Sequence, residues 1–267
     1  MVGFYDSGIG GLTILKEVLK LQPNFSYIYF ADTQALPLGD KSVEFIRNRV
    51  TEACIELFNC GCNVVVLACN TASVTSIRYI QQVWLKENYP NKQVLSIAIP
   101  LIELANNKLL ELKLSSGLIF STLATHNSGF YQYKLITDGF LNCKSVSLSG
   151  LANAIEDGDN ASISHIINTQ VVDQKINPHS IKYIILACTH YKWAISEIKA
   201  IFPVAEIIEP SQILAVKLFD YLKRHPEFPH SNTQLPQIIV TGNNKNFKKF
   251  LKELKINQVL LEKYYSV

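Results

Sequence analysis

Residues 63–73 read NVVVLACNTAS and place a cysteine at the junction of two predicted elements. Four aliphatic residues, Val64 to Leu67, are typical of a strand that is buried on both faces of a parallel sheet. The short polar residues that follow, Asn70 and Thr71, suit the start of a helix. Ligands of open α/β sheets bind at such junctions, and a helix N-terminus lowers the pKa of a thiol. Cys69 therefore fits either a functional thiol or a small buried hydrophobic residue.

The composition limits the class of protein. The chain has 267 residues, of which 48% are hydrophobic, and its formal net charge is +3. This length fits one large domain or two small ones, and the balanced charge does not indicate binding to nucleic acid or to a membrane. We find no signal-peptide pattern in MVGFYDSGIGG, and the longest apolar run, Val94 to Ile102, is too short to span a bilayer. The sequence predicts a cytoplasmic protein with six reduced cysteines.

Short apolar runs alternate with amphipathic stretches along the whole chain. In residues 42–59, apolar side chains recur with helical spacing. The alternation predicts an α/β fold with mostly parallel sheets flanked by helices, and about nine strands divide naturally into two such units. The predicted strands are Val2–Tyr5, Tyr27–Phe30, Val64–Ala68, Val94–Ile99, Gly117–Phe120, Val146–Leu148, Tyr183–Ala187, Ala205–Ile208 and Gln237–Val240.

The opening stretch has a second copy. Residues 183–192 read YIILACTHYK, so an aliphatic strand again ends in Leu-Ala-Cys and is followed by threonine. Cys69 and Cys188 are separated by 188 − 69 = 119 residues, about the length of a small domain. Two units of this kind, each with a thiol at the carboxyl edge of its sheet, can face each other across a cleft.

Paired thiols limit the chemistry further. The two cysteines are far apart in sequence and lack the C-x-x-C spacing of redox pairs, and the lone Cys60-Gly61-Cys62 pair predicts no metal site. Inversion of a stereocentre needs one acid/base group on each face of a carbon atom. A thiolate and a thiol meet this need in both directions, because the ordinary pKa of a thiol, about 8.5, is within reach of neutral pH.

Several segments together resemble the glutamate racemases, which are cofactor-independent enzymes that supply D-glutamate for bacterial peptidoglycan. These segments are GFYDSGIGGLTIL (3–15), FADTQALPLGDKS (30–42), LACNTAS (67–73), STLATHNSGFY (121–131) and ACTHY (187–191). The resemblance implies two pseudo-symmetric α/β domains with the active site in the cleft between them. It places residues 1–98 and 208–267 in the first domain and residues 99–207 in the second, and it leaves a homodimer as an option.

The resemblance also assigns roles to residues by motif position. Cys69 would take the α-proton of D-glutamate and Cys188 that of L-glutamate. Three further residues would assist these thiols, namely Asp6, His190 and Glu156, although Glu156 equally fits a surface carboxylate. The substrate would be bound by Ser7, Leu38, Gly39, Asn70, Thr71, Thr122, Thr125 and Thr189.

A glycine-rich turn follows the first predicted strand. Gly8, Gly10 and Gly11 lack the third glycine of a dinucleotide fingerprint, because position 13 is Thr13. The turn therefore favours the binding of a carboxylate by backbone N–H groups over the binding of NAD. The sequence predicts no cofactor.

The chain departs from the family pattern at several positions. Leu38 stands where the family usually has tyrosine, which removes one hydroxyl from the expected substrate site. Ala187, Lys192 and Trp193 are expected to alter the rim of the second half-site, and Ile99-Pro100 keeps the proline of an expected inter-domain strand. Racemisation of another amino acid such as aspartate, a Cys–His hydrolase built on Cys188 and His190, and a binding module without catalysis stay open as alternatives.

Overall fold

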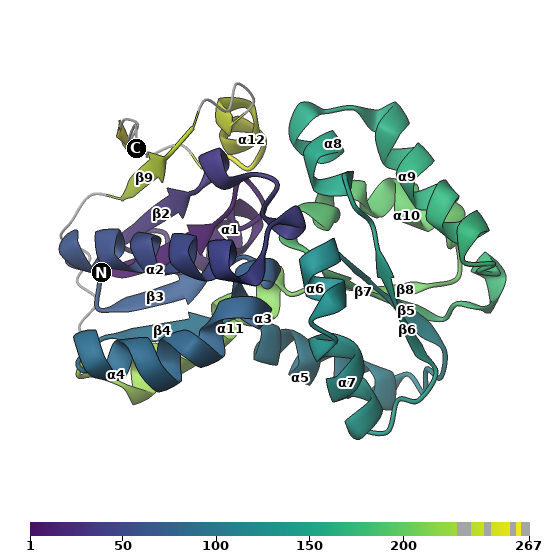
Figure 1. Cartoon of the computed structure of the whole chain (residues 1–267), viewed down its shortest axis with the longest axis horizontal. Coiled ribbons are helices and arrows are strands. Elements are labelled where there is room, and N and C mark those ends of the chain that lie inside the picture. The colour runs from purple at the N-terminus through teal and green to yellow at the C-terminus, as the bar shows by residue number, and fades with distance from the viewer. Residues whose placement is uncertain (229–235, 243–246, 257–259, 263–267) are drawn as a thin grey trace.

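The computed structural model describes residues 1–228, 236–242, 247–256 and 260–262, and these form two parallel sheets (Figure 1). The first sheet has the strand order β10-β9-β2-β1-β3-β4 and the second has the order β6-β5-β7-β8. The strands of the first sheet are β1 (Val2–Asp6), β2 (Tyr27–Ala31), β3 (Val64–Leu67), β4 (Gln93–Ser96), β9 (Gln237–Val240) and β10 (Leu260–Glu262). Those of the second are β5 (Gly117–Ser121), β6 (Cys143–Ser147), β7 (Tyr183–Ala187) and β8 (Glu206–Ile208). The predicted fold class is confirmed.

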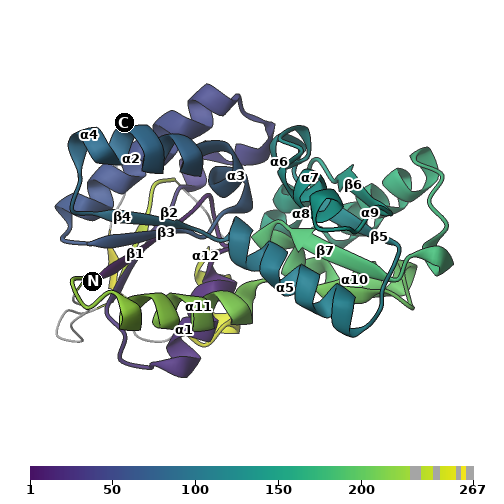
Figure 2. The same ribbon diagram turned by 90° about the horizontal axis from the view of Figure 1, so that it is seen from below.

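Helices connect the strands and cover both faces of each sheet (Figures 1 and 2). The α-helices are α1 (Leu12–Leu21), α2 (Val43–Asn59), α3 (Asn70–Tyr79), α4 (Leu85–Asn88), α5 (Ala98–Glu111), α6 (Leu123–Asn127), α7 (Phe130–Thr137), α8 (Leu151–Asp157), α9 (Asn160–Asp173), α10 (Ile195–Ile201), α11 (Ser211–Arg224) and α12 (Phe247–Glu253). Short 3₁₀ helices are η1 (Thr33–Ala35), η2 (Leu38–Asp40), η4 (Pro178–Ser180) and η5 (Thr189–Ala194), and a π-helical turn, η3 (Ile80–Trp84), joins α3 to α4. Within the described residues, no helix has the length and apolar content needed to cross a bilayer.

The predicted helix over residues 42–59 is confirmed as α2. Ser42 caps its N-terminus, where the side-chain oxygen accepts a hydrogen bond from the Phe45 N–H group. The apolar residues at helical spacing, among them Ile46, Val50 and Leu57, are buried against the first sheet. The amphipathic pattern therefore predicted both the element and the face that it buries.

Alternating strand residues divide the interior of the molecule into layers. Phe4 of β1 packs on the side of α1 and α11, whereas Tyr5 packs on the side of α2 and α3. In the second sheet, Phe120 faces α8, α9 and α10, and Ile119 faces α5 and α7. The cluster that contains Phe4 and Phe120 is continuous, so one hydrophobic core spans both sheets.

The chain passes from the first sheet to the second after β4 and returns to the first with β9. The first passage corrects a prediction, because β4 ends at Ser96 and Ile99-Pro100 lies in the first turn of α5. Ser96 accepts a hydrogen bond from the Ala98 N–H group at 3.0 Å and so supports the start of the helix. Proline is tolerated in a first turn because the N–H groups there have no partner within the helix.

One further strand prediction needs adjustment, and one strand was not predicted. The strand predicted at Val146–Leu148 is β6, which begins earlier, at Cys143, and ends at Ser147. The short edge strand β10 was not predicted, and it pairs in parallel with β9. The domain boundaries at 98/99 and 207/208 stay a prediction.

Candidate active site

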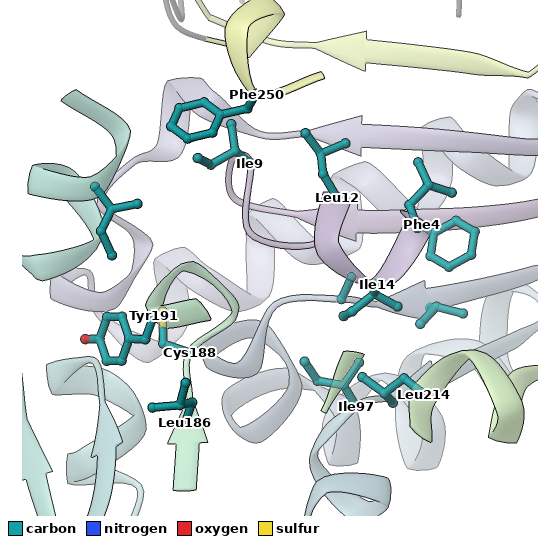
Figure 3. Close-up of a cluster of buried hydrophobic side chains, with 14 of the residues drawn as sticks. Phe4, Ile9, Leu12, Ile14, Ile97, Leu186, Cys188, Tyr191, Leu214 and Phe250 are labelled. Carbon is teal, nitrogen blue, oxygen red and sulfur yellow. The ribbon is translucent and has the colours of Figure 1, made fainter. Parts of the chain in front are cut away.

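The two repeated cysteines occupy equivalent places in the two sheets. Cys69 follows β3 and forms the N-cap of α3, and Cys188 follows β7 at the start of η5. Each thiol-bearing residue is only 6% exposed, and both line the same cavity. In Figure 3, Cys188 lies beyond Leu186 at the end of β7 and beside Tyr191. The repeat therefore marks two strand-to-helix junctions that meet at one cavity.

Segments from both sheets form the walls of this cavity. Most of the predicted site residues line it, namely Ser7, Leu38, Gly39, Cys69, Asn70, Thr71, Thr122, Cys188, Thr189 and His190. Asp6, Glu156 and Thr125 are buried behind this lining and reach it through other side chains. The burial of Glu156 removes the alternative of a surface carboxylate.

Cys69 has two polar neighbours from the loop after β1. The Ser7 hydroxyl lies 3.7 Å from the Cys69 sulfur, and the Asp6 carboxylate interacts with the thiol through its charge. Burial, and after it the charge of Asp6, raises the pKa of Cys69 to about 12, although the N–H group of Ala72 opposes this shift. The expectation of a lowered pKa at this helix N-terminus is therefore wrong, because burial and a neighbouring carboxylate outweigh the helix N–H groups.

His190 stands on the Cys188 side of the cavity. Its Nε2 atom lies 2.7 Å from Oε1 of Glu156, and both side chains are buried. Burial disfavours the charged imidazolium, but hydrogen bonds with Cys188 and Glu156 outweigh it and raise the pKa of His190 well above its ordinary value. These hydrogen bonds therefore favour the protonated form of His190 beside the second thiol.

The glycine-rich turn holds carboxylates of the chain itself. The Gly8 N–H group donates to Asp6 at 2.9 Å, and the Ile9 N–H group donates to Glu156 at 3.0 Å. A Cβ atom on Gly10 would lie 2.2 Å from the Thr189 hydroxyl oxygen, so this close approach requires glycine. These N–H groups thus bind Asp6 and Glu156, and the predicted binding of a ligand carboxylate by this turn stays a prediction.

Three threonines form a contact between the segment after β3 and the segment after β5. The Thr71 hydroxyl lies 2.8 Å from that of Thr122 and 3.3 Å from that of Thr125. Thr122 is also the N-cap of α6, where it accepts a hydrogen bond from the Thr125 N–H group. Gly39 lies directly against Thr122, because a Cβ atom there would approach the threonine Cβ to 2.5 Å.

Comparisons with known proteins give the family of this fold and site. No family model matches the chain. The glutamate racemase of Jannaschia sp. (strain CCS1) is 33% identical over 255 residues, which cover 92% of each chain. That of Roseobacter denitrificans is 32% identical and covers 91% of each. The chain belongs to the glutamate racemase family.

Solved structures support the fold assignment. A glutamate racemase isoform from Bacillus anthracis, RacE1, is similar with a TM-score of 0.82 at 24% identity, covering 100% of this chain and 97% of that one. The glutamate racemase of Francisella tularensis in complex with D-glutamate gives a TM-score of 0.82 at 22% identity, with 99% and 97% covered. The aspartate racemase of Picrophilus torridus is less similar, with a TM-score of 0.54 at 18% identity and coverage of 85% and 98%.

The departures from the glutamate racemase pattern differ in their relation to the cavity. Leu38 lines the cavity and is buried, so an apolar side chain stands at the place where the family usually has the tyrosine hydroxyl. Ala187, Lys192 and Trp193 are not among the residues that line the cavity, and their effect on its rim stays a prediction. Lys192 instead pairs with Glu209 at 3.0 Å, and the Trp193 ring packs on Phe250 with 5.3 Å between ring centroids.

Sequence reasoning also missed residues at this cavity. Asp40, Ser149 and Asn153 line the cavity, and Asp40 accepts a hydrogen bond from the Ser149 hydroxyl at 3.2 Å. Tyr131 lies behind the cavity and donates a hydrogen bond to Asn70. Two of these residues carried a signal, because Asp40 lies in the segment FADTQALPLGDKS and Tyr131 ends the segment STLATHNSGFY.

Proposed function

We propose that this chain interconverts L- and D-glutamate without a cofactor, with Cys69 and Cys188 as the two acid/base groups. Two observations support this assignment: each thiol ends a strand of a different sheet, and both line the same cavity. Membership of the glutamate racemase family supports glutamate as the substrate. The proposal includes the supply of D-glutamate for peptidoglycan in the cytoplasm.

The reaction transfers one proton to the enzyme and returns another. A thiolate at one cysteine removes the α-proton, and the thiol of the other cysteine delivers its own proton to the opposite face. The substrate leaves inverted, and the two cysteines have exchanged their protonation states. In this scheme Cys69 acts on D-glutamate and Cys188 acts on L-glutamate.

The neighbours of the two thiols suit these roles differently. On the Cys188 side, hydrogen bonds raise the pKa of His190, which favours a positive charge near the sulfur. Among the described residues, no such cation lies beside Cys69, and burial and Asp6 keep its pKa high. The α-ammonium group of a bound amino acid would bring the missing positive charge to this side, and so favour deprotonation of Cys69.

Neutral donors would bind the substrate carboxylates. The described part of the cavity lining contains no lysine or arginine, but it includes Asn70 and Thr71 at the N-terminus of α3. Backbone N–H groups and the helix dipole favour anions at this position. Leu38 makes one wall apolar, and this observation favours aspartate or a related amino acid as the second candidate substrate.

The proposal is tested by incubating the protein with D-glutamate in deuterated water without added cofactor. We expect L-glutamate to form with deuterium at the α-carbon, because the delivered proton comes from a thiol that exchanges with solvent. D-Aspartate in a parallel reaction tests the second candidate. Inversion without deuterium uptake would contradict the two-base mechanism, and faster turnover of aspartate would contradict glutamate as the substrate. A Cys–His hydrolase would give neither inversion nor exchange.

A further inference from the structure

Asn70 and Tyr131 form a buried contact directly behind the cavity. Asn70 is the first residue of α3, beside Cys69, and it is 1% exposed. Tyr131 lies on α7 and is 2% exposed, and its hydroxyl donates a hydrogen bond to the Asn70 side-chain oxygen. The ring belongs to the core cluster that also contains Leu101 and Leu135. A residue packed in the second sheet's core thus contacts a cavity residue of the first unit.

The direction of this hydrogen bond follows from the donors available. Burial, and after it the charges of Cys69 and Cys188, raises the pKa of Tyr131 well above its ordinary value, so the hydroxyl keeps its proton. If the Asn70 amide were turned over, its NH₂ group would face this hydroxyl. The amide could then donate to the tyrosine oxygen, but the tyrosine proton would lose Asn70 Oδ1 as its acceptor. An unsatisfied buried polar atom costs about 1–3 kcal/mol, which favours the orientation with the oxygen toward Tyr131.

The same orientation leaves a donor for a ligand. The Asn70 Nδ2 atom is buried and has no hydrogen-bond partner among the described residues. Because Asn70 lines the cavity, this amide group is available to an acceptor bound there. Buried polar atoms of native proteins are nearly always hydrogen-bonded, so an unpaired one beside a cavity points to a bound partner.

We propose that Tyr131 is a positioning residue, which holds the Asn70 amide so that its NH₂ group donates to a carboxylate of the substrate. The inference rests on the proposed function, because it takes an amino acid as the ligand of the cavity. It adds a role for α7, since this helix fixes a donor that α3 presents. In Tyr131→Phe, the missing hydroxyl would leave the Asn70 amide free to turn. The amide oxygen would then face the cavity and repel a carboxylate.

The test is a double-mutant cycle on the full chain. Tyr131→Phe keeps the ring and removes only the hydroxyl, and Asn70→Ala removes the donor. We expect KM to rise about 10- to 100-fold in Asn70→Ala, as for a hydrogen bond to a charged group, and about 3- to 10-fold in Tyr131→Phe. The double variant should match Asn70→Ala alone, because Tyr131 acts through Asn70.

Two further variants keep the result clear. Tyr133→Phe alters an exposed tyrosine of the same helix and should leave both kcat and KM unchanged. Asn70→Asp keeps the shape of the side chain and replaces the donor with an oxygen, so its KM should exceed that of Asn70→Ala. Thermal midpoints of all variants show whether a loss of binding merely follows a loss of folding.

The outcomes distinguish the positioning role of Tyr131 from the proposed racemisation. Fold-increases of KM that multiply in the double variant, or a Tyr131→Phe variant with normal KM, would overturn the positioning role and leave racemisation intact. If the wild-type protein racemises aspartate instead of glutamate, the cycle is measured with aspartate, and only the substrate assignment fails. A wild-type protein that racemises neither amino acid overturns the proposed function and this inference with it.

Discussion

The charge of His190 depends on two neighbours from different segments. Cys188 precedes it by two residues, and Glu156 reaches it from α8. Burial alone would lower the pKa of this histidine, whereas the hydrogen bonds with both neighbours raise it. Glu156 also accepts the Ile9 N–H group, so it ties His190 to the turn after β1. The carboxylate thus controls both the charge and the position of the histidine.

We predict that Glu156→Gln lowers the pKa of His190, because a favourable charge is replaced by a neutral amide. Since the folded-state pKa of His190 is raised, its stabilising contribution is fully present below the unfolded value of about 6.5 and is lost as pH rises through the folded-state value. The wild type should therefore exceed the variant in unfolding free energy near pH 6, by about 1.5–3 kcal/mol. The difference should shrink at alkaline pH.

An NMR titration of the histidine ring protons measures the first effect, and urea unfolding at several pH values measures the second. His165→Gln alters an exposed histidine and serves as the control. If His190 titrates at the same pH in the wild type and in Glu156→Gln, the described electrostatic link is wrong.

Among the larger elements, the turn between β1 and α1 connects the two sides of the site. Gly8 and Gly10 bring this backbone against Glu156, Thr189 and His190. We predict that Gly10→Ala lowers kcat/KM on the order of 100-fold, because the added methyl group must displace Thr189 and His190, and small displacements of catalytic groups have effects of this size. Initial rates with D-glutamate give the value, and circular dichroism checks that the fold persists. A variant with normal kcat/KM would show that this contact does not position the site.

Element-level reasoning explains what the sequence could predict. The run Val64–Leu67 was predicted correctly because it is short and is soon followed by polar residues that start a helix, and the repeated Leu-Ala-Cys located both thiols. The run after Val94 was misjudged because its apolar residues continue from β4 into α5, and an apolar run alone does not distinguish strand from helix.

Properties that depend on distant segments could not be predicted in this way. The high pKa of Cys69 results from burial and from Asp6, which lies in another strand. The contact between Tyr131 and Asn70 joins residues 61 positions apart, and no local pattern links them. Such effects arise from tertiary packing, which single-sequence periodicity does not contain.

At the scale of the whole molecule, one continuous core fixes the two halves of the site. The cluster drawn in Figure 3 includes Leu12 of α1 and Leu214 of α11 together with Leu186 and Cys188 beside β7. Phe250 of α12 belongs to the same cluster and contacts Trp193 of η5. Ala68, which precedes Cys69, belongs to this core, as does Cys188. Because packed interiors resist small displacements, the core limits the relative movement of the two strand ends that carry the thiols. The central claim is that they act on opposite faces of one carbon atom.

The most direct test measures half-reactions of Cys69→Ser and Cys188→Ser, with Cys60→Ser as a control outside the cavity. The substrates are 3-chloroglutamate with the L and with the D configuration at the α-carbon. A single thiolate can remove the α-proton as chloride leaves, and the resulting enamine hydrolyses to 2-oxoglutarate and ammonia. We predict that neither site variant racemises glutamate, that Cys69→Ser eliminates chloride only from the L-form, and that Cys188→Ser does so only from the D-form. Racemisation by either single variant, or use of the same enantiomer by both, would contradict the account.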